Sequence, residues 1–376
     1  MAKFGNCAEL ITSSVNPLDC ADLPYIGLEH IAEGGLSLLN YGYGRDVSSQ
    51  KTRFKKGDIL FGKLRPYFRK VIIAPFNGVC STDIWVVRAK KGIDQKYLFY
   101  WMASKDFIGE ATRASEGTKM PRAKWDFVSK LEKDVPSLPI QQKIASILGA
   151  FDDKIELNRL MNRTLESIAR TIFRKWFVDS EAVESWEKGQ IKDIGKVITG
   201  KTPSTNNKEN YYGEMPFITI PDMHEKTFVI KTEKTLSEKG VQAQANKTLP
   251  PYSICVSCIA TPGLVSLTIA KSQTNQQINT LIPKNSKSTF YFFFALKQLG
   301  DYIKARGSGG SVLLNLNKGQ FETIPILIPP ISLRHQFQEI VEPLLIKLLS
   351  NEKESFILAS LRDELLPKLV QVENNF

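Results

Sequence analysis

Leu23-Pro-Tyr-Ile-Gly-Leu-Glu-His-Ile31 has a counterpart in the same chain, Met215-Pro-Phe-Ile-Thr-Ile-Pro-Asp-Met223, which begins 192 residues further on. Two more pairs of segments lie 194 residues apart: Ser81-Thr-Asp-Ile with Asn275-Gln-Gln-Ile, and Tyr97-Leu-Phe-Tyr with Tyr291-Phe-Phe-Phe. Self-similarity at a nearly constant separation indicates a repeated structural unit. The sequence therefore predicts two copies of one unit of about 190 residues.

Each predicted unit has two parts. Short β-branched and aromatic runs broken by Gly, Pro and Asn, such as Ile84-Trp-Val-Val and Phe217-Ile-Thr-Ile, predict an irregular sheet in the first part. Apolar residues at three- and four-residue spacing, with almost no Gly or Pro, then predict a long helix. The predicted fold class is α+β, with mixed α/β domains at 1–140 and 181–330 and helices at 141–180 and 331–376.

The two predicted helices carry apolar stripes at coiled-coil spacing, so we expect them to pair antiparallel as a coiled coil with an internal pseudo-twofold. Asn158 and Asn351 interrupt the stripes near the middle of each helix, either as polar seam residues that set the register or as solvent-facing residues. A helix of this length spans roughly 50–55 Å. The pair would therefore act as a spacer that sets the distance between two recognition domains. The predicted pairing residues are Leu148, Phe151, Ile155, Asn158, Leu165 and Ile172, with Val341, Leu344, Leu348, Asn351, Leu358 and Leu365.

The composition is that of a folded protein with a basic surface. Among 376 residues, 50 Lys and Arg outnumber 39 Asp and Glu, so the net charge is +11, and 42% of the residues are hydrophobic. No stretch approaches the ~18–20 apolar residues of a membrane span, and the N-terminus has no apolar signal core. Five scattered cysteines form no disulfide framework. We expect a cytoplasmic protein with no membrane association.

Motifs for catalysis and metal binding are weak. Cys255-Val-Ser-Cys258 is a lone CxxC pair, whereas tetrahedral zinc needs two more ligands, so a buried strand is favoured. Gly195-Lys-Val-Ile-Thr-Gly-Lys-Thr202 matches the phosphate-loop pattern, but the residues between its glycines are typical of a strand and no helix is predicted after it. We therefore predict a non-catalytic binding protein with no metal and no cofactor of its own.

Basic and amide residues cluster with aromatic residues in both units. Such cations neutralise phosphates, while Arg, Lys, Asn and Gln read base edges in the major groove of duplex DNA. The first unit also has the basic run Lys51-Thr-Arg-Phe-Lys-Lys56. The clusters differ between the repeats, as expected for two different half-sites. The predicted DNA-binding residues are Lys63, Arg65, Tyr67, Arg69, Lys70, Lys119, Arg122 and Lys124, with Lys201, Thr202, Ser204, Asn206, Asn207, Lys208, Asn275, Gln276 and Gln277.

Over essentially its whole length the chain resembles the specificity (S) subunit of type I restriction–modification systems. Each sequence motif that carries the resemblance is weakly specific by itself, but their order and repetition are specific. The motifs are the Leu23 segment, Gly57-Asp-Ile-Leu-Phe-Gly-Lys-Leu-Arg-Pro, Leu138-Pro-Ile-Gln-Gln-Lys-Ile-Ala-Ser-Ile-Leu, Thr199-Gly-Lys-Thr-Pro-Ser and Ile328-Pro-Pro-Ile-Ser-Leu-Arg-His-Gln-Phe.

The resemblance implies a non-catalytic targeting subunit. Residues 1–140 and 181–330 would be target-recognition domains that each read one half of a bipartite, asymmetric DNA site. Residues 141–180 and 331–376 would be helical spacers that set the distance between the half-sites and dock two modification (methyltransferase) subunits. Those partners would bring S-adenosylmethionine for DNA methylation of adenine, and restriction (translocase/endonuclease) subunits would bring ATP and Mg.

Two other functions remain open from the sequence. A stand-alone two-headed DNA-binding regulator would bind DNA tightly without any methyltransferase. A nuclease or an ATPase that used the Gly195–Thr202 loop would bind a metal or a nucleotide as the lone chain, and Lys201→Ala would abolish its activity. The apolar surface of the helices, which is available to partners, weighs against the regulator.

Overall fold

The computed structural model describes residues 1–116, 119–259, 261–307 and 316–370. The chain forms two compact units, one from Met1–Asn158 with Glu354–Phe376 and one from Arg159–Lys353. The predicted domain boundaries fall at the ends of the long helices. The boundaries between the two compact units instead fall near the middle of each long helix. The reason is that the two halves of each helix pack on different domains. Residues 371–376 of the second predicted spacer lie outside the described part.

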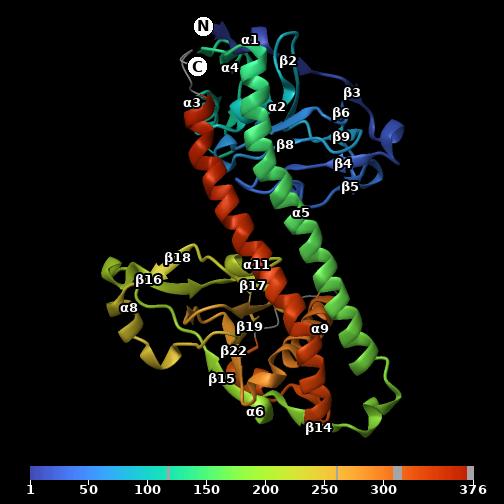
Figure 1. Cartoon of the computed structure of the whole chain (residues 1–376), viewed down its shortest axis with the longest axis vertical. Helices are drawn as coiled ribbons and strands as arrows, with labels where there is room; N and C mark the ends of the chain where they lie inside the picture. Colours follow the sequence, from blue (N-terminus) through green and yellow to red (C-terminus); the bar gives the residue numbers. More distant parts are fainter. Residues whose placement is uncertain (117–118, 260, 308–315, 371–376) are drawn as a thin grey trace. The chain divides into compact units, whose positions relative to one another are not determined.

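Unit 1 is built on two sheets (Figure 1). The first has the order β2 (Ala8–Ile11), β10 (Ile84–Ala89), β7 (Ile59–Gly62) and β8 (Val71–Ile73), and all its pairs are antiparallel. The second has the order β3 (Ser14–Val15), β6 (Lys51–Phe54), β9 (Gly78–Cys80), β4 (Pro24–Ile26) and β5 (Gly42–Tyr43). Helix α2 (Gln95–Ala103) contributes Tyr97 and Trp101 to a core that also holds Phe61 and Trp85.

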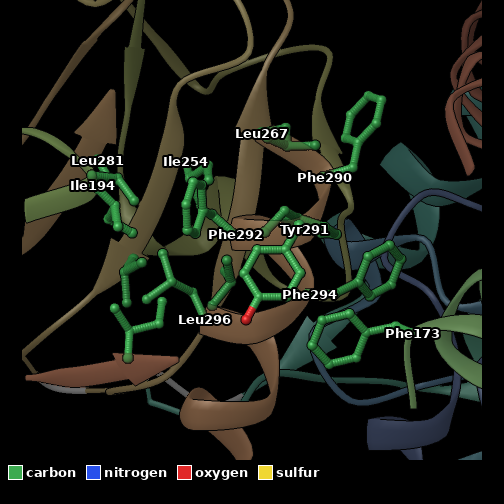
Figure 2. Packing of buried hydrophobic residues seen from close by; sticks show 14 of the residues in the cluster. Phe173, Ile194, Ile254, Leu267, Leu281, Phe290, Tyr291, Phe292, Phe294 and Leu296 are labelled. Carbon is green, nitrogen blue, oxygen red and sulfur yellow. The ribbon is translucent and has the colours of Figure 1, made fainter. Parts of the chain in front are cut away.

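Unit 2 repeats this plan. Its main sheet has the order β15 (Gly195–Thr199), β22 (Ile278–Pro283), β19 (Ile254–Ser257), β20 (Val265–Thr268) and β17 (Phe228–Val229). A smaller sheet has the order β18 (Lys234–Leu236), β16 (Tyr211–Ile218) and β21 (Gln273–Thr274). The aromatic face of α9 (Thr289–Gly307) packs on the main sheet, with Phe292 and Leu296 toward Ile254 and Leu281 (Figure 2).

The remaining elements are short. In unit 1 they are β1 (Ala2–Lys3), α1 (Phe4–Cys7), α3 (Lys105–Arg113), β11 (Ser115–Glu116), β12 (Arg122–Ala123), α4 (Trp125–Val128) and β13 (Glu132–Lys133). In unit 2 they are β14 (Glu187–Gln190), α6 (Ile191–Ile194), α7 (Ile220–Met223), α8 (Glu238–Gln242), α10 (Lys318–Glu322) and β23 (Pro325–Ile328). Short 3₁₀ turns join many of these elements.

The strand registers confirm the repeat at the level of single residues. In unit 1, Ile59 pairs with Val87, and in unit 2 the residues at the matching positions, Ile254 and Leu281, pair in the same way. The one parallel pair in the second sheet of each unit also recurs, as β4 with β9 and as β16 with β21. Two segments of different sequence therefore fold on one framework.

The two long helices are α5 (Leu138–Phe177) and α11 (Ile331–Val370), and they pair antiparallel in each unit as predicted. In unit 1 Asn158 contacts Glu354, and Asp152, earlier in α5, contacts Arg362, later in α11. In unit 2 Asn351 contacts Asn162. Helix α5 begins at Leu138 rather than at 141, because proline is compatible with the first helical turn and Pro139 does not delay the start.

The seam asparagines are buried, so the solvent-facing alternative is wrong. Asn158 and Asn351 are both fully inaccessible. The Asn158 amide donates to Glu354 (2.9 Å) and to the hydroxyl of Ser355 (3.2 Å), and the Asn351 amide donates to Asn162 (2.9 Å). Leu148, Val341 and Leu348 are buried, while Phe151, Ile155, Leu165, Ile172, Leu344, Leu358 and Leu365 are half-buried.

Candidate nucleic-acid interface

Two basic segments of unit 1 that are more than fifty residues apart form one ribbon, residues 63–65 with residues 119–124. The backbone N–H of Ala123 donates to the carbonyl of Lys63 (2.9 Å), and that of Arg65 donates to the carbonyl of Pro121 (2.8 Å). The Arg65 guanidinium also donates to the carbonyl of Lys119 (3.2 Å). We call this pair of segments the basic ribbon. It brings together five predicted residues, which are Lys63, Arg65, Lys119, Arg122 and Lys124.

The cations of the basic ribbon differ in how they are held. Arg122 is an exposed side chain that forms a two-point ion pair with Asp83 (2.8 and 3.3 Å), and this hydrogen bonding raises the pKa of its guanidinium. Lys119 and Lys124 are exposed, Lys63 is half-buried, and the neighbouring Tyr67 is half exposed. The ribbon therefore presents a partly fixed row of positive charge, which suits a phosphate backbone.

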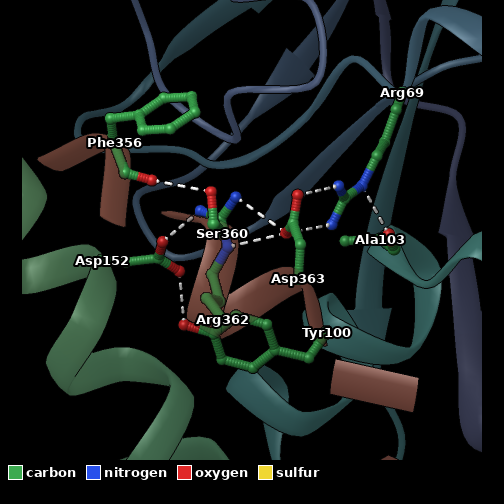
Figure 3. Close-up of polar contacts among 8 residues, drawn as sticks. All are labelled: Arg69, Tyr100, Ala103, Asp152, Phe356, Ser360, Arg362 and Asp363. Atoms are coloured by element: carbon green, nitrogen blue, oxygen red, sulfur yellow. Dashed lines mark hydrogen bonds and ion pairs between the residues drawn. The ribbon is translucent and has the colours of Figure 1, made fainter. Parts of the chain in front are cut away.

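Two of the predicted DNA-binding residues have hydrogen-bond partners within unit 1. The Arg69 guanidinium donates two hydrogen bonds to Asp363 (2.8 and 3.0 Å) and one to the carbonyl of Ala103 (2.7 Å; Figure 3). The Lys70 ammonium donates to the carbonyl of Leu28 (2.7 Å). These bonds give Arg69 and Lys70 a structural role within unit 1, as the Asp83 pair does for Arg122, and a DNA contact of Arg69 and Lys70 stays a prediction.

Two polar segments of unit 2 also meet, residues 201–208 and residues 275–277. The backbone N–H of Lys201 donates to the carbonyl of Thr274 (3.0 Å), and the Thr202 hydroxyl donates to the side-chain carbonyl of Gln276. A Cβ atom at Gly200 would lie 2.1 Å from the carbonyl oxygen of Asn275, so only glycine permits this close approach. We call the two segments the polar loop pair.

Within the polar loop pair, Lys201, Ser204, Asn206, Lys208 and Gln276 are exposed. Of the other predicted members, Thr202, Asn207 and Gln277 are half-buried and Asn275 is buried. Asn207 caps the following 3₁₀ turn, and Asn275 is buried and bonded to Gln277. The exposed members supply ammonium, hydroxyl and amide groups, which are the groups that can contact phosphates and base edges.

The same residues exclude the phosphate-loop interpretation. Gly195–Thr199 is strand β15, as its composition predicts, and residues 200–207 form a loop that leads only to a single 3₁₀ turn, Lys208–Asn210. A phosphate loop needs a helix whose N-terminal amides point at the phosphates. The predicted buried strand at the CxxC pair is also confirmed, since Cys255 and Cys258 are buried in or next to β19.

The two units place their polar groups at different points of the shared framework. The position in unit 2 that corresponds to the basic ribbon joins Cys258 to Leu316, where the N–H of Leu316 donates to the carbonyl of Cys258 (3.2 Å). Cys258 is buried there, and its neighbour Asn279 donates to its sulfur. Among the residues that the structure describes at this position, the basic ribbon therefore has no charged counterpart in unit 2.

Two features of the molecule were not predicted from the sequence. A cavity of about 410 Å³ in unit 1 is lined by Arg53, Lys55 and Arg88, and Arg88 is held by Asp58 (2.6 Å). The basic run of residues 51–56 was a usable signal for this cavity. Tyr212, next to the polar loop pair, is the second feature, and nothing in its local sequence distinguishes it.

In the part of the chain that the structure describes, no group of three or more His, Cys, Asp or Glu side chains could hold a metal ion. Nor does any helix among the described residues have the length and apolarity needed to cross a membrane.

The chain matches a family model described as the type I restriction modification DNA specificity domain, at residues 2–167 and 183–355. It is 34% identical to the type I restriction enzyme HindI specificity subunit of Haemophilus influenzae, over 88% of this chain and 89% of that protein. It is 26% identical to the MjaIX specificity subunit of Methanocaldococcus jannaschii, over 95% and 85%. The crystal structure of a type I restriction–modification S subunit from M. genitalium has the same fold, with a TM-score of 0.60, 18% identity and coverage of 99% and 96%.

Proposed function

Because the chain belongs to the type I restriction modification DNA specificity family, we propose that each of its units reads one half of a split DNA site on behalf of partner enzymes. As a member of this family the chain is a DNA sequence-specificity subunit that works within a complex. Unit 1 would read its half-site with the basic ribbon, and unit 2 would read the other with the polar loop pair. Target recognition would be the whole contribution of this chain, and the catalytic groups would belong to its partners.

The observation that carries this proposal is that the two units share one sheet framework but present different polar surfaces. The register of β7 with β10 agrees residue by residue with that of β19 with β22, yet the ribbon position is charged in unit 1, whereas the described residues that pair there in unit 2, Cys258 and Leu316, are uncharged. Loops on a rigid scaffold are where recognition residues change between related proteins. Two heads of this kind suit an asymmetric site better than a palindrome.

The helices supply an argument for two copies of one partner. Exposed apolar side chains recur at equivalent positions of the repeat, Ile147 with Ile340 and Ile168 with Leu361. Exposed apolar groups on a helix suit a protein interface. Two equivalent surfaces would dock two methyltransferase subunits, which would bring S-adenosylmethionine, while restriction subunits would add ATP and Mg.

The first experiment is modified-base sequencing of the host genome with and without this gene. We expect one split, adenine-methylated motif to disappear when the gene is deleted. Replacing Lys63 and Arg65 by Glu should then change methylation through one half of the motif, and Gln276→Ala should affect the other half. A methylation pattern that does not change on deletion would contradict the proposed function.

A second experiment tests the helices as the spacer. Both α5 and α11 contribute to both units, so four residues inserted after Asn158 and four after Asn351 lengthen the pair by one turn, about 6 Å. We expect the gap between the half-sites to grow by about two base pairs while both half-sites stay the same. A gap of unchanged length would mean that the helices do not measure it.

A further inference from the structure

Tyr212 is 87% exposed, whereas no other aromatic residue in the described part of the chain exceeds 50%. Within that part, its ring packs on no other ring and its hydroxyl forms no hydrogen bond. Its backbone is left-handed, with φ of 66°. This conformation is unfavourable for a bulky side chain, because its Cβ atom crowds the following carbonyl.

The rest of unit 2 holds Tyr212 in this conformation. The pairing of β16 with β18 shifts register, because Tyr211 and Met215 both lie opposite Leu236, and residues 212–214 between them form a bulge. A Cβ atom on Gly213 would lie 2.5 Å from the carbonyl oxygen of Leu236, so the bulge is tightly packed. A β-bulge redirects a side chain. Here the bulge turns an aromatic ring into solvent.

The bulge is anchored to the polar loop pair on its other side. The Tyr211 hydroxyl donates to the carbonyl of Pro203 (2.7 Å), and the Asn210 amide donates to the carbonyl of Ser204 (3.1 Å). Tyr212 therefore stands on a fixed base that is bonded to the polar loop pair, and little conformational entropy would be lost when its ring makes a contact.

A second tyrosine of unit 2 has the same backbone conformation, but its ring packs inside the unit. Tyr252 also has a left-handed backbone, with φ of 59°, but its ring packs against Phe290 with centroids 6.3 Å apart. Packing inside unit 2 thus compensates Tyr252. Backbone strain without such compensation gathers at functional sites.

We propose that Tyr212 is a DNA-contacting finger whose ring packs against the bases of the half-site that unit 2 reads. This inference rests on the proposed function and adds a contact of a different kind from those of the polar loop pair. The exposed lysines and amides of the polar loop pair favour a polyanion, and Glu209, next to Lys208 in the chain, is paired with Lys239. Aromatic contact with bases adds affinity without neutralising a phosphate, and apolar side chains wedge between base steps in many DNA complexes.

The test uses the complex assembled with its methyltransferase subunits and a duplex that carries the methylated motif of the host. Tyr212→Ala should weaken binding about ten- to hundred-fold, whereas Tyr212→Phe should stay close to the wild type. The slope of log affinity against log salt should not change in Tyr212→Ala, because no phosphate contact is lost. Lys201→Ala, the matched variant on the polar loop pair, should make the slope shallower.

Two further variants separate folding from binding. Tyr212→Gly relieves the left-handed strain, so its unfolding temperature should equal or exceed that of the wild type while its DNA affinity falls as in Tyr212→Ala. Tyr252→Ala should lower the unfolding temperature and leave the DNA affinity of the folded complex unchanged.

The inference is overturned if Tyr212→Ala binds the motif as tightly as the wild type. It is equally overturned if Tyr212→Ala weakens assembly with the methyltransferase subunits while each assembled complex keeps its DNA affinity, since the ring would then contact protein. A wild-type complex that failed to prefer the motif would overturn the proposed function, and this inference with it.

Discussion

The junction between helix and domain is charged in unit 1 and apolar in unit 2, although the framework is the same. In unit 1, Arg362 is only 2% exposed and pairs with Asp152, which also accepts a hydrogen bond from the Tyr100 hydroxyl (2.6 Å; Figure 3). Asp363 joins Arg362 to Arg69. We call these five residues the buried network.

In unit 2 the repeat places Leu345, Ala169 and Phe294 at the positions of Asp152, Arg362 and Tyr100. All three are buried, and Phe294 stacks on Phe173 of α5 at 5.7 Å between centroids (Figure 2). Phe177 and Phe337 extend the same cluster. One geometric site has thus been filled in two chemically opposite ways.

The comparison shows that a buried position can hold either a charged or an apolar side chain, provided that each charged group has hydrogen-bond and ion-pair partners. Burial opposes the charge on Arg362, yet Asp152 and Asp363 more than compensate and raise the pKa of its guanidinium. The same two arginines, Arg69 and Arg362, hold the pKa of Asp363 below its usual value although burial alone would raise it. Such a network is about as stable as an apolar core when complete, but far less tolerant of losing one member.

The largest effect is expected from Arg362→Ala. It removes a side chain that is only 2% exposed, leaves Asp152 without its arginine partner and leaves Asp363 with Arg69 alone, so it should destabilise unit 1 by about 3–5 kcal/mol. Urea unfolding of the full chain, followed by amide exchange in α2 and in the start of α5, would measure this loss. The set Tyr100→Phe, Asp152→Leu and Arg362→Ala copies unit 2 and should restore most of the stability. If the set is no more stable than Arg362→Ala alone, the two junctions are not equivalent.

Arg69→Ala should cost about 1.5–3 kcal/mol, because it removes charged hydrogen bonds to a partly buried carboxylate. The same urea unfolding measures it. In the assembled complex, the salt dependence of DNA binding should stay that of the wild type, whereas Lys63→Ala should reduce it. A reduced salt slope in Arg69→Ala would show that this residue also contacts DNA.

Glu352 should make the stability of unit 2 fall as the pH rises, whereas Asp363 of the buried network makes the stability of unit 1 fall as the pH drops. Burial raises the pKa of Glu352 to about 7, with Lys226 opposing and Glu166 adding to the shift. The folded state therefore keeps a proton that the unfolded chain, with an ordinary pKa near 4.5, releases. The stability of unit 2 should fall by roughly 1–2 kcal/mol as the pH rises from 5 to 8.

Amide exchange in α9 and in the second half of α5, corrected for intrinsic rates, measures the effect of pH on unit 2. Glu352→Gln is the control and should remove the dependence between pH 5 and 8. Asp363 in unit 1 has a lowered pKa, so its contribution is lost only below about pH 4 and does not interfere. The same dependence in Glu352→Gln would assign the titration to another group.

The smallest effect is expected from Lys154→Ala. Lys154 pairs with Glu354 at 3.2 Å on the same two helices as the buried network, but both side chains are more than 40% exposed. An exposed pair contributes less than about 0.5 kcal/mol. Urea unfolding that showed a loss close to that of Arg362→Ala would mean that burial is not what distinguishes the two pairs.

The sequence by itself determined the repeat, the two long helices and their antiparallel pairing. These features depend on spacing along the chain, and spacing can be read directly: Ile59 and Ile254 stand at matching positions of the two repeats, and Asn158 and Asn351 lie near the middle of their apolar stripes. The basic segments at 63–65 and 119–124 could also be chosen as candidates from the sequence, because their charge is local.

Only the tertiary structure decided which charges are available to a partner. Arg69 looks like its neighbours in sequence, but the fold brings Asp363, 294 residues away, within 2.8 Å of it. Tyr212 is distinguished from other tyrosines only by a bulge whose packing depends on Leu236. The physical reason is the same in both cases: the exposure and pairing of a side chain are set by contacts between distant segments, which no local pattern records.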